Sequence, residues 1–537
     1  MTEQPRLIRT GRTMALATLT SRMTGFLRTL ALAAALGLGT RLLDAYTVAN
    51  MTPNTVYELV LGGALAGVMV PMLIRAAAEP GVDSDLHAQR LLSTIVYVLG
   101  ATVVLTVAAA PWIVDLYAPG FSPEQRDLAI LLTRYFLPQI LLYGLGTGMA
   151  AILNARGDLS TPMWAPVANN IVVIATALGY ILLGGGGELS ALTPGQSLLL
   201  SLGTTAGVAV QTLVLAAALR RSGFPLRLRL DPRGIGLRRT ARMAGWSLLY
   251  VIAAQAVFTV GTRLASGAGP GPGPVAVYQN AYTLFQLPYA VIAVSVITGV
   301  LPRMSAAAGG RDLAGITADL SHGLRLTAAV LMPVAAALIV LGPQITTLLF
   351  AHGNASAGAA RLTGSVLAAF GFALVPFAGY QIMLRVFFAL QDTRTPALIH
   401  VGVAVVAITS SIALSRTLPA QDLLVGLAAC YAAAHAVGFA AAGAVLRHRL
   451  GRIDGHRLLR SHARMLAASL AAGGAGALVA HALRHGGMAG AGWTGSLVTV
   501  LAVSAVGAGL YALVAHLLRV PELRTLVSAL RPGAAAG

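Results

Sequence analysis

The sequence contains fourteen long apolar runs, and this feature constrains the fold more than any other. Each run holds about 20 or more residues, the length that an α-helix needs to cross a bilayer. Only 10% of the 537 residues are charged and 56% are hydrophobic, whereas soluble globular domains carry roughly 25% charged residues. The pattern therefore predicts an all-α polytopic membrane protein. The runs are too long for the short alternating strands of a membrane β-barrel.

We expect the spans at residues 12–38, 44–74, 91–115, 127–154, 162–184, 195–219, 241–265, 275–302, 318–349, 361–389, 396–415, 421–446, 462–483 and 495–518.

The distribution of arginine predicts the orientation of these spans. With the N-terminus inside, 26 arginines fall in inner segments, five fall in outer loops, and six remain within or at the edges of spans. Such a bias follows the positive-inside rule. We expect both termini in the cytoplasm, an uncleaved first helix and insertion in a plasma (inner) membrane. The net charge of +19 then reflects topology, and no nucleic-acid partner is expected.

Two halves of the chain repeat each other. "ARGDLSTP" at 155–162 matches "LQDTRTP" at 390–396, and two further motif pairs follow at similar offsets of about 231–234 residues. Six spans form an even number, so both halves enter the membrane in one orientation, as in transporters whose two lobes rock around a central site. We predict an N-lobe at 1–225, a C-lobe at 235–450, an extra pair of spans at 455–520 and a cytoplasmic tail at 521–537.

The first span carries charges where a membrane helix usually has leucines. Ser21, Gly25 and Arg28 recur at helical spacing on one face, with Arg22 beside them. A charged side chain at a bilayer centre costs roughly 2.5–3.5 kcal/mol on insertion scales. Two arginines within one helix therefore predict a cavity, and guanidinium forks match the oxygens of phosphate groups. We expect an anionic headgroup, in particular a pyrophosphate, to bind there.

The second span offers partners for these cations. Asp44 and Glu58 could each offset the charge of an arginine in span 1. Proline bends a helix and glycine permits close packing. On that basis the conformational and packing candidates are Gly25, Pro53, Gly62, Gly63 and Pro288.

Other charged residues in or near spans have simpler interpretations. Arg134 and Arg325 lie near span ends, where we expect their side chains to snorkel to the interface. Arg263 lies in span 7.

Cys430 is the single cysteine, so no disulfide or cysteine metal site is expected. Because no nucleotide loop or catalytic cluster stands out, we expect no enzyme activity and no cofactor.

Several segments together resemble a known family: "LTSRMTGFLRTLALAAALG", "LDAYTVANMTPN", "GGALAGVMVPML", "ILNARGDLSTPMWAPVANNI" and "FFALQDTRTP". They are similar to the MurJ (MviN) lipid II flippases of the multidrug/oligosaccharidyl-lipid/polysaccharide exporter superfamily. The resemblance covers essentially the whole chain and is weaker beyond about residue 420. It implies two six-helix lobes around a central cavity, with spans 13 and 14 at 455–520 forming a groove for a lipid tail.

The resemblance also implies a substrate and a mechanism. Lipid II, the undecaprenyl-pyrophosphate-linked peptidoglycan precursor, would pass from the inner to the outer leaflet by alternating access. Membrane potential or a Na⁺ or H⁺ gradient would drive it, and membrane lipids and cell-wall synthesis proteins would be partners. The family's serine and arginines of the first helix fall on Ser21, Arg22 and Arg28, and its aspartate falls on Asp44.

The sequence departs from the family pattern at sites where other members carry charged residues. The substituted positions are Thr29, Tyr57, Glu58, Tyr282 and Thr283. Family arginines are missing at Tyr57, Glu58 and Thr283. We hypothesise that Arg263 replaces them as a substrate-binding cation.

Three other functions stay open from the residues alone. One is export of another undecaprenyl-linked oligosaccharide, which would also present a pyrophosphate. Another is a cation-coupled drug extruder of the same superfamily, although an arginine-lined cavity would repel organic cations. The third is a scaffold for cell-wall synthesis, for which the chain has no long soluble domain.

Overall fold

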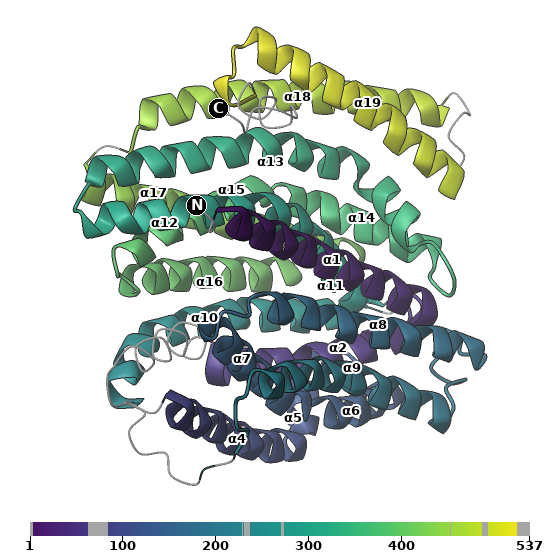
Figure 1. Cartoon of the computed structure of the whole chain (residues 1–537). Helices are drawn as coiled ribbons and strands as arrows, with labels where there is room; N and C mark the ends of the chain where they lie inside the picture. Colours follow the sequence, from purple (N-terminus) through teal and green to yellow (C-terminus); the bar gives the residue numbers. More distant parts are fainter. Residues whose placement is uncertain are drawn as a thin grey trace. The chain divides into compact units, whose positions relative to one another are not determined.

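The computed structural model describes residues 4–62, 84–227, 229, 237–269, 273–451, 453–485 and 492–523. Every regular element in these ranges is a helix (Figure 1). The helices pack into two compact units. Unit 1 comprises Met1–Gly267 with His352–Ser356, and unit 2 comprises Ala268–Ala351 with Ala357–Gly537.

Unit 1 contains α1 (Gln4–Leu36), α2 (Arg41–Tyr57), the π-helix η1 (Glu58–Gly62), α4 (Ser84–Ala108), α5 (Ala110–Tyr117), α6 (Pro123–Phe136), α7 (Gln139–Ala155), α8 (Ser160–Leu182), α9 (Pro194–Arg221) and α10 (Leu237–Ser266). Unit 2 contains α11 (Pro274–Pro288), the π-helix η2 (Tyr289–Ala293), α12 (Val294–Gly309), α13 (Leu313–Phe350), α14 (Ala357–Gly371), α15 (Leu374–Ala389), α16 (Arg394–Ser415), α17 (Ala420–Leu450), α18 (Gly455–His485) and α19 (Trp493–Leu517).

Within the described residues each predicted span falls on a helix or on consecutive helices, and residues 63–74 of the second predicted span lie outside them. Among the described residues, eleven helical segments are long and apolar enough to cross a membrane, or twelve if the bent pair α14 and α15 forms one span. The remaining two predicted spans fall on α1 and α2. The all-α membrane fold is confirmed, and the count of fourteen spans is consistent with it.

The division into packing units does not follow the predicted lobe boundary at 225–235. Helix α10 belongs to unit 1, where it contacts α5 and η1. Units defined by packing contacts need not coincide with the lobes that move during transport. The predicted lobes and tail therefore stay a prediction.

The internal repeat is visible as a similar aspartate-containing turn that occurs once in each half. In the first copy, Asp158 accepts hydrogen bonds from the amide and hydroxyl of Thr161. In the second copy, Asp392 accepts from the amide of Thr395, and the Arg449 guanidinium donates to the same carboxylate over 2.5 Å. The residue before each aspartate has a left-handed backbone, with φ 87° at Gly157 and φ 58° at Gln391. The equivalent positions therefore fold alike.

Both halves also contain a π-helical segment after a proline. Pro53 lies inside α2, which continues into η1, and Pro288 ends α11, which continues into η2. Because proline lacks an amide hydrogen, it cannot complete the α-helical hydrogen bond to the fourth residue before it. Single π-turns inside helices are often found at functional sites. The chain that follows each of these two prolines is therefore π-helical in both halves.

Helices α18 and α19 pack side by side against α13 in unit 2 (Figure 1). Small side chains dominate the buried contact, which is formed by Ala328, Ala329, Met465, Ala468, Ala472, Tyr511, Ala515 and Val520. The Tyr511 hydroxyl donates to the carbonyl of Ala329 over 2.7 Å. Small residues let helix backbones approach closely, and such packing associates helices in membranes.

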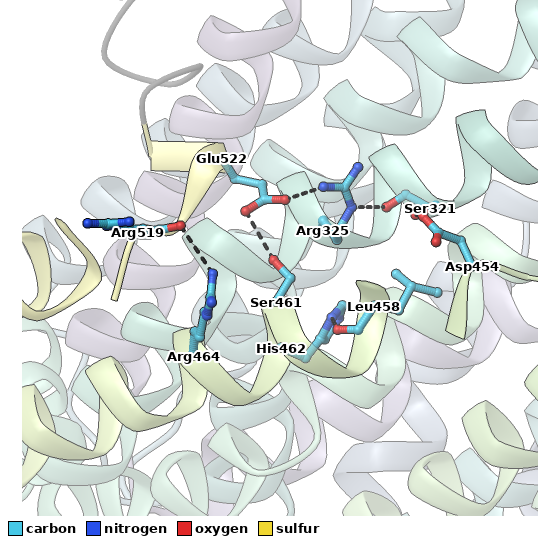
Figure 2. A network of polar contacts seen from close by, with 9 residues as sticks. All are labelled: Ser321, Arg325, Asp454, Leu458, Ser461, His462, Arg464, Arg519 and Glu522. Atoms are coloured by element: carbon cyan, nitrogen blue, oxygen red, sulfur yellow. Dashed lines mark hydrogen bonds and ion pairs between the residues drawn. The ribbon is translucent and has the colours of Figure 1, made fainter. Parts of the chain in front are cut away.

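A buried ion pair closes one end of this three-helix contact. Arg325 of α13 and Glu522, which follows α19, are 7% and 4% exposed, and their side chains are 2.5 Å apart. The Ser461 hydroxyl of α18 donates to the second oxygen of Glu522 over 3.0 Å (Figure 2). The prediction that Arg325 snorkels is therefore wrong, because a partner distant in sequence neutralises it inside the protein.

Further bonds tie the neighbouring turns to the same place. The Ser321 hydroxyl of α13 donates to Asp454, in the turn before α18, over 3.0 Å. Arg464 donates to the carbonyl of Arg519, in the turn after α19 (Figure 2). Asp454 and Arg519 both have left-handed backbones, with φ 53° and 54°. Residues other than glycine adopt this conformation only where the surroundings require it. We call the seven residues Ser321, Arg325, Asp454, Ser461, Arg464, Arg519 and Glu522 the C-terminal polar network.

We predict that Glu522→Ala lowers the free energy of unfolding by about 3–5 kcal/mol, because it leaves the Arg325 charge buried without its partner. The double variant Arg325→Met/Glu522→Leu should recover most of that loss, since it removes both charges. Thermal unfolding in detergent measures both effects. Equal stability of Glu522→Ala and the unchanged protein would show that the pair is not needed.

We predict a pH-dependent loss of stability in Asp392→Asn. Burial raises the pKa of the Asp392 carboxyl, but hydrogen bonds from Thr395 and the Arg449 guanidinium outweigh burial and lower the pKa below 3.8. A lowered pKa stabilises the fold above the unfolded pKa, and the effect disappears as pH falls through the folded pKa. The melting temperatures should differ at neutral pH, begin to converge below about pH 4, near the unfolded pKa, and become equal only below the folded pKa. A constant difference across this range contradicts the prediction.

Candidate functional site

Helix α1 packs along α8 through the face that carries Ser21 and Gly25. The Asn170 side chain of α8 donates to the carbonyl of Ser21 over 3.2 Å and to the hydroxyl of Thr24 over 3.0 Å. A Cβ at Gly25 would lie 3.5 Å from the Asn170 amide. Part of the predicted polar stripe therefore holds two helices together.

Both arginines of α1 are partly buried. Arg28 lies within the range of electrostatic interaction with the side chains of Tyr46 in α2 and Tyr143 in α7. Phenol side chains are neutral, so these two tyrosines do not cancel the positive charge of the guanidinium. Such a cation keeps its attraction for an anion.

The two tyrosines are fixed by further hydrogen bonds inside unit 1. The Tyr46 hydroxyl is 2.8 Å from the hydroxyl of Thr204 in α9. The Tyr143 hydroxyl donates to Gln139 over 3.0 Å, and Gln139 in turn donates to Thr205 over 2.9 Å. Polar groups held by such a network are ordered before a ligand arrives, which lowers the entropic cost of binding.

Tyr57 extends this group at a position where the family pattern has an arginine. Its hydroxyl is 2.8 Å from the hydroxyl of Thr147, and its ring centroid is 6.0 Å from that of Tyr143. A phenol therefore stands close to the Arg28 environment where a cation was expected. We call Arg28, Tyr46, Tyr57 and Tyr143 the arginine–tyrosine group.

The two acidic candidates occupy different settings in the second span. Asp44 is 1% exposed in the first turn of α2, where the positive end of the helix dipole favours a carboxylate. Glu58 is partly buried and begins the π-helix η1. Their pairing with Arg22 and Arg28 stays a prediction.

Arg263 is exposed near the end of α10 and caps a neighbouring helix. Its guanidinium donates to the carbonyls of Asp115 and Leu116 over 3.0 and 2.9 Å, at the end of α5. A cation is favourable at the negative end of a helix dipole. This contact gives Arg263 a structural role, and the hypothesis that it also binds substrate stays a prediction.

The remaining candidates are placed as follows. Thr283 is exposed and donates to the carbonyl of Gln279 in its own helix. Pro288 immediately precedes η2, Pro53 is buried in α2, and Gly62 ends η1. Gly63 lies outside the described residues. Within the described ranges, no group of three or more His, Cys, Asp or Glu side chains is suited to hold a metal ion.

Sequence analysis missed the tyrosines and amides that surround α1. Asn170 stands in "APVANNI" of the fifth span, where two adjacent asparagines in an apolar run were a usable signal. Tyr143 and Gln139 are separated by one helical turn in the fourth span. Nothing local in the sequence connects them to Arg28, because these residues approach one another only when the helices of unit 1 pack together.

Comparison with known proteins identifies the family. The family model described as lipid II flippase MurJ matches residues 32–498 of the chain. The chain belongs to the MurJ family. It is 31% identical over 415 residues to the probable lipid II flippase MurJ of Rhizobium meliloti, covering 74% of this chain and 73% of that relative. It is 29% identical over 396 residues to lipid II flippase MurJ of Burkholderia cenocepacia, covering 72% and 74% of the two chains.

A solved structure agrees with the MurJ assignment at the level of the fold. It is described as lipid II flippase MurJ in an inward closed conformation, and it aligns with a TM-score of 0.74 and 20% identity. The alignment covers 96% of this chain and 99% of that one. The MurJ resemblance seen in the sequence is confirmed, and this MurJ family member is a multi-pass bacterial membrane protein of the transporter class.

We predict that Gly25→Ala is tolerated and that Gly25→Leu is not. A single methyl group makes an ordinary contact with Asn170, whereas a leucine would push α1 away from α8, at a cost of about 1–3 kcal/mol. Thermal unfolding of the two variants measures the difference. Equal melting temperatures would mean that α1 does not pack on α8 through this face.

Proposed function

We propose that this protein flips lipid II from the inner to the outer leaflet of the plasma membrane by alternating access. Membership of the MurJ family supports the substrate, and the carrying observation in the structure is the arginine–tyrosine group in unit 1. No covalent step is needed, so the protein binds and translocates its substrate and is not an enzyme.

The pyrophosphate of lipid II fits the chemistry of this group. Arg28 offers a guanidinium fork for phosphate oxygens. The hydroxyls of Tyr46, Tyr57 and Tyr143 can donate further hydrogen bonds once the anion displaces their present arrangement. Arg22, Ser21 and Asp44 would complete the headgroup site, and Glu58 and Arg263 are further candidates at its edge.

The direction of transport follows from the proposed orientation. The excess of arginine in alternate loops supports cytoplasmic termini, so the inner leaflet is where the substrate enters. Because one guanidinium among phenols carries net positive charge, movement of the site across the membrane would respond to the membrane potential. An ion gradient is an additional source of energy, and membrane lipids and cell-wall synthesis proteins are proposed partners.

Export of another undecaprenyl-linked oligosaccharide would use the same pyrophosphate contacts. The family match and the curated relatives favour lipid II. A drug extruder of the same superfamily is not favoured by these matches.

The test is lipid II translocation by the purified full chain in proteoliposomes. We predict that Arg28→Ala lowers the translocation rate by roughly ten- to a hundredfold, the worth of about 1.5–3 kcal/mol for hydrogen bonds to a charged group. Arg28→Lys should recover part of the rate, because it keeps the charge and loses the fork. The matched control is Arg416→Ala, which removes an exposed arginine after α16. If Arg28→Ala and Arg416→Ala translocate equally well, the proposed headgroup site is wrong.

A further inference from the structure

Two histidines lie buried together inside unit 2, apart from the headgroup site. His400 of α16 is 5% exposed and His435 of α17 is 3% exposed, and their ring centroids are 6.5 Å apart. Both helices are long and apolar enough to cross a membrane. An ionisable side chain inside a membrane bundle indicates a functional site by default.

Aromatic rings surround the pair. Tyr431 and Phe377 have ring centroids 4.1 and 5.2 Å from His435. Tyr380 stacks on His400 at 6.1 Å with an interplanar angle of 10°, and it also meets His435 edge-on at 6.3 Å. Rings packed this closely keep water away from the imidazoles, and burial favours the neutral form of a histidine.

Hydrogen bonds fix where a proton can be added. The Nδ1 atom of His435 is 2.9 Å from the carbonyl oxygen of Tyr431. A carbonyl can only accept, so Nδ1 carries hydrogen and Nε2 is the basic nitrogen. The Tyr380 hydroxyl is 3.3 Å from Nδ1 of His400, which lets a phenol exchange roles with that imidazole. The geometry thus leaves one nitrogen of His435 to take up a proton.

The groups that face the pair come from the helices packed around it. They are Tyr380 of α15 and Tyr431 of α17, with Tyr282 of α11 against Tyr431. Arg385, further along α15, lies over the ring of Phe388. Two imidazolium ions at this separation would repel each other. The pair can therefore bind one proton but not two, because of this repulsion.

A small cavity of about 10 Å³, room for about one water molecule, lies between α13, α15, α17 and α18. Its lining includes Thr327, Gly379, Phe439 and His462. The hydroxyl of Thr327 is buried without a hydrogen-bond partner among the described residues. Unsatisfied buried hydroxyls are places where internal water binds.

The lining of the cavity comes from helices that also carry His435 and part of the C-terminal polar network. Gly379 directly precedes Tyr380, and Phe439 is one helical turn from His435. His462 of its lining is the neighbour of Ser461 in the network (Figure 2). His435 and this part of the network are thus carried by helices that share one internal space.

We propose that His400 and His435 form a proton-binding site through which a proton gradient drives the transport cycle. The proposal rests on the proposed function, and it names the part of the molecule that senses the gradient. Neutral imidazoles suit the closed aromatic cluster, whereas a charged imidazole favours a conformation in which water reaches it. Proton binding thereby shifts the packing of α15, α16 and α17, which contact one another in unit 2.

The experiment measures lipid II translocation by the full chain in proteoliposomes, with the potential clamped at zero and a pH gradient imposed. For one coupled proton, a gradient of one pH unit shifts the equilibrium distribution of lipid II by about tenfold. We expect this tenfold shift, called the bias below, in the unchanged protein. His400→Gln and His435→Gln should each lose it while still translocating lipid II without a gradient.

The matched control is a second histidine pair. His481 and His485 of α18 have ring centroids 4.2 Å apart but are exposed. His481→Gln should keep the full bias. If a His435 or His400 variant fails to fold, Tyr380→Phe takes its place, and it should weaken the bias by removing the hydroxyl at His400.

The outcomes separate the two proposals. Translocation without any bias in the unchanged protein overturns the proton site, and so does a full bias in the His400, His435 or Tyr380 variants. A protein that translocates no lipid II under any gradient or potential overturns the proposed function instead.

Discussion

The cost of holding guanidinium groups inside a membrane protein shapes this structure. Arginine cannot lose its charge by deprotonation, so each buried copy needs partners. In unit 2 the protein neutralises Arg325 with Glu522, the Ser461 hydroxyl donates to Glu522, and Arg325 donates to the carbonyl of Ser321. In unit 1 Arg28 lies among phenols instead. The Arg325–Glu522 pair stabilises the contact between helices, whereas the arrangement around Arg28 keeps a cation available for a ligand.

The repeated halves contain the same kinds of turn and π-helix but carry different polar groups. The aspartate turns at Asp158 and Asp392 begin α8 and α16 in the same way. The π-helices η1 and η2 follow prolines at equivalent places. Yet the first half holds the arginine–tyrosine group and the second holds a buried histidine pair. Duplication of a stable framework thus allowed the two halves to specialise, one for binding and one for sensing a gradient in the proposed cycle.

Much of the fold could be predicted from the sequence because membrane spans are encoded locally. Apolar runs located the helices, and proline positions pointed to both irregular segments, although not to their π-helical form. The charges were harder. Arg325 looked like a snorkelling residue because Glu522 is far away in sequence and lies outside every span. Tyr143 and Asn170 escaped notice because their importance depends on which helices α1 packs against, and no local pattern determines that.

The separation of Arg325 and Glu522 has a consequence for biosynthesis. The two residues are 197 positions apart. During synthesis α13 therefore enters the bilayer with an arginine whose counterion has not yet been translated. The three-helix contact can close only after Glu522 has been synthesised. Premature termination before Glu522 would leave a charged, incompletely assembled protein, which gives membrane quality control a ready mark of an unfinished chain.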